Sequence, residues 1–245
     1  MDKAKKEKQL NFRTGLIDGI PIALGYLSVS FGFGVLCMRL GLSILQAVGI
    51  SATNVTSAGQ VAGVGIIAAA GTLIEMILTQ FVINVRYSLM AISLSQKLDG
   101  TFTTPKRLLL SFGITDEIFA VAYSQKSLIN TRYMAGLEVI SIAGWVLGTL
   151  LGASAGSILP ESLINAMGLM LYGMFIAIVV PPARKNRGIL CASLIAIICS
   201  LVFYYLLPQI TSGFSIILCA LTASVLCALL FPVKDEAPAA EEVDA

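Results

Sequence analysis

The sequence predicts an all-α, polytopic helical membrane protein with about 7–8 transmembrane segments. Of its 245 residues, 57% are hydrophobic and only 12% are charged, whereas charged residues make up about 25% of soluble domains. Apolar runs long enough to cross about 30 Å of hydrocarbon as helices recur along the chain. The ten-residue alternation that is typical of membrane β-barrels is absent.

Three parts are expected along the chain. Residues 1–14 are polar and rich in lysine, which predicts a basic cytoplasmic tail. Residues 15–232 are predicted to form a single helical transmembrane domain. Residues 233–245 are acidic and rich in Ala and Pro, which predicts a disordered tail.

Seven apolar segments are predicted as single spans. They lie at about 16–38, 71–96, 108–123, 134–158, 163–180, 189–207 and 214–231. The first run leads into further spans, so we expect a transmembrane helix there rather than a cleaved signal peptide.

The remaining segment, residues 42–70, is more polar. Within Ser51–Gln60 six of ten residues are polar, and on a helix they would point in all directions. This predicts a helix that is buried in protein, or one that is discontinuous around residues 51–65, with freed backbone groups lining a cavity. An ordinary span, in which Ser and Thr bond to their own backbone, is the alternative.

The distribution of basic residues favours one topology over another. With the N-terminus inside, a single crossing by residues 42–70 places the cluster around Arg184 inside, but leaves Lys97, Lys106 and Arg107 outside. A re-entrant segment would reverse both placements. We expect the single crossing.

Charged residues inside apolar segments are the main candidates for function. Asp116 and Glu117 are adjacent in a predicted span, where each charge costs roughly 2.5–3.5 kcal/mol. Arg86 lies eleven residues after Glu75, about 16 Å along a helix, so Arg86 needs another partner. Asp116 or Glu117 is the candidate, and the alternative is that Arg86 reaches to an interface.

Three polar patches, at 51–60, 75–87 and 115–117, together offer carboxylates, a guanidinium group, amides and hydroxyls. These groups could hold a zwitterion, with nearby apolar residues receiving a side chain. The candidate residues for substrate binding or coupling are Asn54, Ser57, Gln60, Asn84, Arg86, Tyr87, Thr115, Asp116 and Glu117.

Composition argues against several other functions. There is no histidine, which excludes histidine-based triads, metal sites and proton relays. The five cysteines form no Cys-x-x-Cys and are interpreted as buried apolar residues. We therefore expect no enzyme, cofactor or metal site, and the net charge of +2 gives no reason to expect nucleic acid. A structural membrane subunit and a channel remain alternatives to a transporter.

Glycines recur in the span at 134–158. They have four-residue spacing, which predicts a face for close helix packing, and are Gly144, Gly148, Gly152 and Gly156. A shift of 119 residues aligns Gly25 with Gly144 and Tyr26 with Trp145. That weak match suggests an internal repeat of the kind found in transporters.

Several stretches resemble the AzlC family of branched-chain amino acid permeases. They are Gly19-Ile-Pro-Ile22, Phe31-Gly-Phe-Gly34, Ser57-Ala-Gly-Gln60, Asn84-x-Arg86-Tyr87, Thr115-Asp-Glu-x-Phe-Ala120 and Gly144-Trp-x-x-Gly-Thr149. The resemblance covers about residues 12–190. Two positions depart from the family pattern: Tyr87 stands where members usually carry histidine, and Ser57 where an aromatic residue before Ala-Gly is common.

The resemblance implies a secondary transporter in the bacterial cytoplasmic membrane. It implies export of branched-chain or similar apolar amino acids, driven by the proton gradient. It also implies a small partner subunit of the AzlD type, supplied by a separate chain.

Overall fold

The computed structural model describes residues 9–155 and 179–231, together with Pro160, Ser162, Gly173 and Ile176. The predicted C-terminal tail, most of the N-terminal tail and most of the span at 163–180 lie outside these residues. The chain divides into two compact units, Met1–Phe175 and Ile176–Ala245.

The all-α membrane class is confirmed. Five of the described helices are long and apolar enough to cross a membrane. They match predicted spans and are α1 (Phe12–Arg39), α4 (Leu73–Ser95), α7 (Thr131–Ala155), α9 (Arg187–Leu206) and α10 (Ser212–Leu230). Large apolar side chains on α4 are exposed, among them Phe81 and Leu89, as expected for a surface that faces lipid.

Helices α1 and α7 pack closely, with little side-chain volume between them. A Cβ atom at Gly144 would overlap the backbone of Ala23, and one at Gly152 would overlap the backbone of Phe31. The predicted glycine face is therefore confirmed for its described members, while Gly156 lies outside the described residues.

These two helices run parallel. Gly15, near the start of α1, packs on Tyr133 near the start of α7, and Gly34, near the end of α1, packs on Ala153. The α1–α7 pair therefore has an N-terminal end and a C-terminal end. The helices that the 119-residue shift equates are thus direct neighbours in the same orientation.

The segment at 42–70 is a re-entrant hairpin that enters from the C-terminal end of the pair. Helix α2 (Ile44–Thr53) is followed by an extended break at Asn54–Thr56 and then by α3 (Ser57–Ala68). The Gln60 side chain donates to Ser51 Oγ across the hairpin (3.0 Å). Val64, in the second half of α3, packs in one cluster with Phe33 and Cys37, which lie in the last turns of α1.

The discontinuity predicted at 51–65 is therefore present, but the expected single crossing is wrong. Polar side chains bond to each other at the break: Thr56 Oγ1 donates to Asn54 Oδ1 (2.8 Å). After it, α3 turns back toward the end from which α2 entered.

The predicted span at 108–123 is a second hairpin, which enters from the N-terminal end. Helices α5 (Thr104–Ser111) and α6 (Asp116–Tyr123) are separated by a break at residues 112–115. Each has eight residues, about 12 Å of helix, which is too short to cross. After α6, the Gln125 side chain donates to the Tyr133 hydroxyl (2.9 Å), back near the start of α7.

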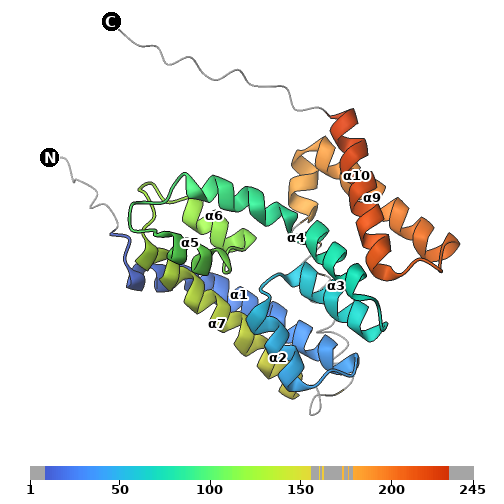
Figure 1. Ribbon diagram of the computed structural model, residues 1–245, viewed down its shortest axis with the longest axis horizontal. Helices are drawn as coiled ribbons and strands as arrows, with labels where there is room; N and C mark the ends of the chain where they lie inside the picture. The colour runs from blue at the N-terminus through green and yellow to red at the C-terminus, as the bar shows by residue number, and fades with distance from the viewer. Residues whose placement is uncertain are drawn as a thin grey trace, which may run out of the picture. The chain divides into compact units, whose positions relative to one another are not determined.

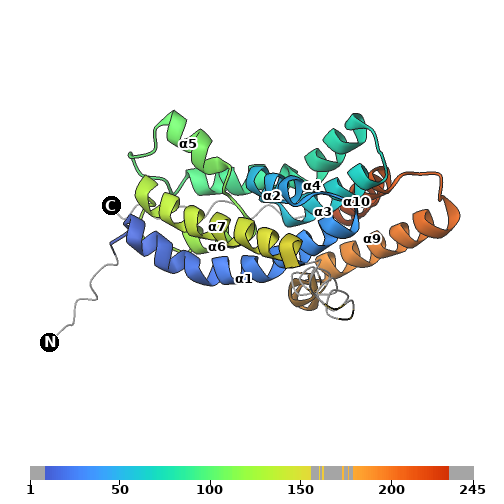
Figure 2. The ribbon, with the colours of Figure 1, turned by 90° about the horizontal axis from the view of Figure 1, so that it is seen from below.

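The first unit thus alternates spans with half-crossing hairpins. Helices α5 and α6 lie toward one end of α1 and α7, and α2 and α3 toward the other (Figures 1 and 2). Between the hairpins, α4 runs opposite to α1, because it begins beside α3 and ends where Leu94 joins the cluster around Tyr133.

The second unit contains an antiparallel pair of helices. The position of Gly188, at the start of α9, lies beside Phe231, which follows the end of α10. These helices confirm the predicted spans at 189–207 and 214–231.

We predict that the Gly144→Ala variant is less stable than the wild type by about 1–3 kcal/mol, because the added methyl group meets backbone rather than a movable side chain. Thermal unfolding of the purified protein in detergent measures this. Gly25→Ala is the matched control, since no atom lies within 4 Å of its added methyl group. Equal midpoints for the two variants would contradict the close α1–α7 contact.

Candidate functional site

Tyr26 on α1 bonds to the tip of the second hairpin, by which we mean the break at residues 112–115 and the first residues of α6. The Tyr26 hydroxyl lies 2.5 Å from Thr115 Oγ1 and 2.6 Å from Glu117 Oε2. One hydroxyl proton serves one acceptor, so we assign Tyr26 as donor to Glu117 and Thr115 as donor to Tyr26. Thr115 also caps α6 by accepting from the Ile118 backbone N–H (3.3 Å).

Trp145 on α7 bonds to the tip of the first hairpin, by which we mean the break at Asn54–Thr56 and the first residues of α3. The indole Nε1 donates to Gln60 Oε1 (2.9 Å), and the ring packs edge-on against Tyr26 with centroids 5.1 Å apart. Ser51 extends the connection through a 2.7 Å hydrogen bond to Thr149. The two hairpin tips therefore converge on the Tyr26–Trp145 contact.

Arg86 forms the ion pair that the sequence suggested. Its Nη1 lies 2.8 Å from Asp116 Oδ2, Nη2 donates to the Tyr87 hydroxyl (3.2 Å), and the guanidinium lies 4.9 Å from the Tyr87 ring centroid. The two side chains of the pair are 43% and 33% exposed. Because the pair is accessible, solvent weakens its contribution to stability, but a ligand can reach it.

The amides lie along the contact between α3 and α4. The Gln80 Nε2 donates to the Gly59 carbonyl (2.7 Å), and Asn84 Nδ2 donates to Gln80 Oε1 (3.1 Å). The Asn84 Oδ1 is buried and has no hydrogen-bond partner among the described residues. Ser57 is the first residue of α3, whose N-terminus has no side-chain cap.

The structure thus divides the nine candidate residues into linked groups. Arg86, Tyr87 and the 115–117 segment meet at the second tip, whereas Gln60 reaches that tip through Trp145 and Tyr26. The Asn54 side chain accepts a hydrogen bond from Thr56 within the break. Asn84 lies beside the first turn of α3.

Sequence reasoning missed the aromatic pair that joins the tips. Tyr26 and Trp145 are both buried and separated by 119 positions. The alignment of these two residues by the internal shift was a usable signal, because equivalent positions of a repeat can meet at its axis. Gln80, Ser51 and Thr149 also belong to the network.

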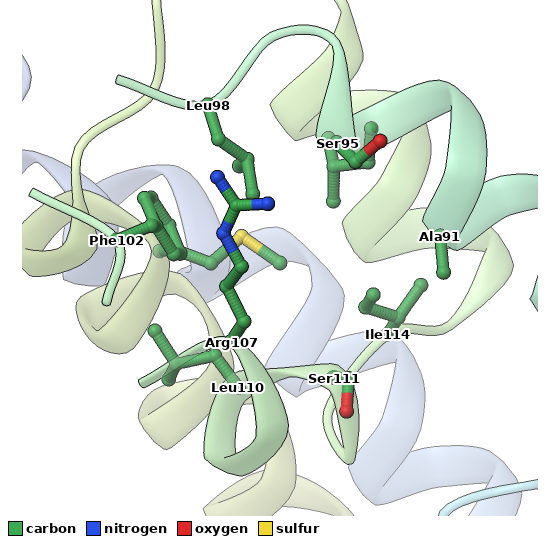
Figure 3. Close-up of a pocket in the computed structure, with 10 residues that line it drawn as sticks. Ala91, Ser95, Leu98, Phe102, Arg107, Leu110, Ser111 and Ile114 are labelled. Carbon is green, nitrogen blue, oxygen red and sulfur yellow. The ribbon is translucent and has the colours of Figure 1, made fainter. Parts of the chain in front are cut away.

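A pocket of about 120 Å³ opens beside the second hairpin. Apolar side chains dominate its lining, and it is formed by Ala91, Leu94, Ser95, Leu98, Phe102, Arg107, Leu110, Ser111, Ile114 and Met134. Figure 3 shows Arg107 extending from α5 alongside Phe102 toward Leu98. Arg107 is exposed, because no described residue covers it.

Comparison with known proteins places this arrangement in a family. The family described as "AzlC protein" matches residues 21–159, more than half of the chain. The chain belongs to the AzlC family. The matched AzlC region includes both hairpin tips and the Tyr26–Trp145 contact.

Relatives extend the match over most of the chain. An "Inner membrane protein YgaZ" of Escherichia coli is 29% identical over 92% of this chain and 94% of its own length. An "Uncharacterized membrane protein" of Archaeoglobus fulgidus is 33% identical over 74% of this chain and 80% of its own. A "Branched-chain amino acid transport protein AzlC" of Bacillus subtilis is 25% identical over 72% and 69%, respectively.

No solved structure matches the chain. Family membership and the spans support a multi-pass membrane protein with a role in membrane transport.

We predict that Tyr26→Phe destabilises the protein by about 1–3 kcal/mol, because it removes the donor of a partly buried hydrogen bond to the charged Glu117 carboxylate. Thermal unfolding in detergent again provides the measurement. Tyr205→Phe is the matched control, since Tyr205 is 72% exposed. If the two variants are equally stable, Tyr26 does not fasten the hairpin.

Proposed function

We propose that this AzlC-family protein exports branched-chain or similar apolar amino acids across the bacterial cytoplasmic membrane, driven by protons and together with a small AzlD-like subunit. The observation that carries the proposal is the meeting of two opposed half-crossing hairpins beside the accessible Arg86–Asp116 pair. Broken helices of this kind form substrate sites in secondary transporters.

The groups at the tips suit an amino acid zwitterion. Arg86 and the uncapped N-terminus of α3 can attract a carboxylate. Asp116 can attract an ammonium group when its pair with Arg86 opens. When a zwitterion binds, its carboxylate takes the place of Asp116 beside Arg86, and its ammonium group takes the place of Arg86 beside Asp116. Each charge therefore keeps an opposite partner, which lowers the cost of desolvation.

The topology supports a cytoplasmic N-terminus. Basic residues gather at the N-terminal end of the α1–α7 pair and comprise Arg13, Lys97, Lys106, Arg107, Lys126 and Arg132. Arg39 lies at the other end. The positive-inside rule therefore favours the N-terminal end as the cytoplasmic one.

A carrier is favoured over an open channel and over an enzyme. The bulky Tyr26–Trp145 contact lies where the two tips converge, so a solute can pass only if this region moves. The absence of histidine from the sequence removes the usual general base.

We predict that Arg86→Gln and Asp116→Asn each lower leucine efflux by about 10- to 100-fold, because a charged hydrogen bond contributes about 1.5–3 kcal/mol. Efflux of labelled leucine from preloaded cells, normalised to the amount of protein in the membrane, measures this.

Arg13→Gln and Asp99→Asn are the matched controls, since both residues lie away from the tips. Wild-type efflux from both site variants would rule out the assigned roles. A purely structural subunit would instead give no leucine efflux from the wild type.

A further inference from the structure

Glu138, on α7, is a buried carboxyl group that the proposed site does not use. It is 4% exposed, and its Oε1 has no hydrogen-bond partner among the described residues. A carboxylate anion is costly in such surroundings unless a cation or a donor compensates it, whereas a neutral carboxyl group avoids most of that cost.

The Glu138 side chain packs directly on the break of the second hairpin. A Cβ atom at Gly113 would lie 2.6 Å from both Cδ and Oε2 of Glu138. Because glycine has no side chain, the carboxyl group touches the backbone of the break itself. A change in the charge of Glu138 would therefore act on the hairpin that carries Asp116.

Other carboxylates in this region have partners. Asp116 pairs with Arg86, Glu117 accepts from Tyr26, and Asp18 accepts from the Tyr133 hydroxyl (2.9 Å). Glu138 thus differs from them in having an orphaned buried oxygen.

Ionisable groups on the neighbouring elements are few at this level. Helix α2 carries none. The ionisable groups on α1, α5 and α6 are Arg13, Asp18, Tyr26, Cys37, Arg39, Lys106, Arg107, Asp116, Glu117 and Tyr123. Among them Arg107 lines the pocket beside the second hairpin.

The lining of that pocket includes neighbours of Glu138. Met134, in its lining, lies one helical turn before Glu138 on the same face of α7. Ser111 and Ile114, also in the lining, flank Gly113. Glu138 therefore lies next to residues that line the pocket. The Arg107 side chain extends from α5 along the pocket (Figure 3).

We propose that Glu138 is the proton-carrying group of the transport cycle and that the Arg107 pocket is its path to the N-terminal face. The inference rests on the proposed function. When the hairpin has moved at Gly113, a proton from the opposite aqueous face bonds to Glu138 Oε1 and gives a neutral carboxyl group. When the hairpin returns, the same O–H bond breaks and the proton leaves through the Arg107 pocket to water at the N-terminal face, so one proton is bound and one is released per cycle.

Everted membrane vesicles from cells that produce the full chain together with the small AzlD-like subunit test this with two readouts. Leucine counterflow without a gradient reports binding and exchange. Leucine accumulation driven by an imposed pH gradient, together with leucine-dependent proton flux, reports coupling. Glu138→Gln should keep counterflow and lose both gradient-driven accumulation and proton flux.

Glu75→Gln is the matched control, because Glu75 is also buried but lies at the start of α4; it should keep coupling. Glu138→Asp retains a carboxyl group and should keep part of the coupling even if the Gln variant does not fold. Wild-type coupling in Glu138→Gln, or none in Glu138→Asp with counterflow intact, would overturn the inference. Absence of counterflow in wild-type vesicles would instead overturn the proposed function, and this inference with it.

Discussion

The close parallel contact of α1 with α7 positions everything else in the first unit. Glycines such as Gly144 bring the two backbones together, and the paired helices then present Tyr26 and Trp145 side by side. Each hairpin tip bonds to one of these two residues. The pair is thus a rigid support on which two short, broken segments can rest at mid-depth.

The membrane explains why such support is required. Backbone groups freed by a helix break need partners, because hydrocarbon offers none. The second hairpin meets this need with Thr115, which caps α6, whereas α3 begins without a side-chain cap. Backbone N–H donors at the start of α3, near Asn84, therefore have no side-chain cap. In the site that we propose, the carboxylate of an amino acid binds there.

Hydropathy and length predicted the fold class, and the density of polar residues at 51–60 predicted the first break. The second break was missed because residues 108–123 are mostly apolar, although sixteen residues fall short of the roughly 20 that a helix needs to cross. The Arg86–Asp116 pair followed from the cost of lone charges in lipid. The link between Gln60 and Trp145 did not, because nothing local relates side chains 85 positions apart.

Correcting the topology also resolves the conflict among basic residues. With both hairpins re-entrant, Lys97, Lys106 and Arg107 lie at the same end as the start of α1. A single crossing by each segment had divided these residues from Lys126. In the first unit, the positive-inside rule and the observed packing of the hairpins now give the same topology.

Side-specific labelling of single cysteines in a cysteine-free background tests the opposed hairpins most directly. If the hairpins enter from opposite ends, Ser43→Cys and Ala69→Cys react with an impermeant thiol reagent from one side of the membrane, and Gly100→Cys and Ser127→Cys react from the other. If Ser43→Cys reacts together with Gly100→Cys, and Ala69→Cys together with Ser127→Cys, both segments cross the membrane and the account is wrong.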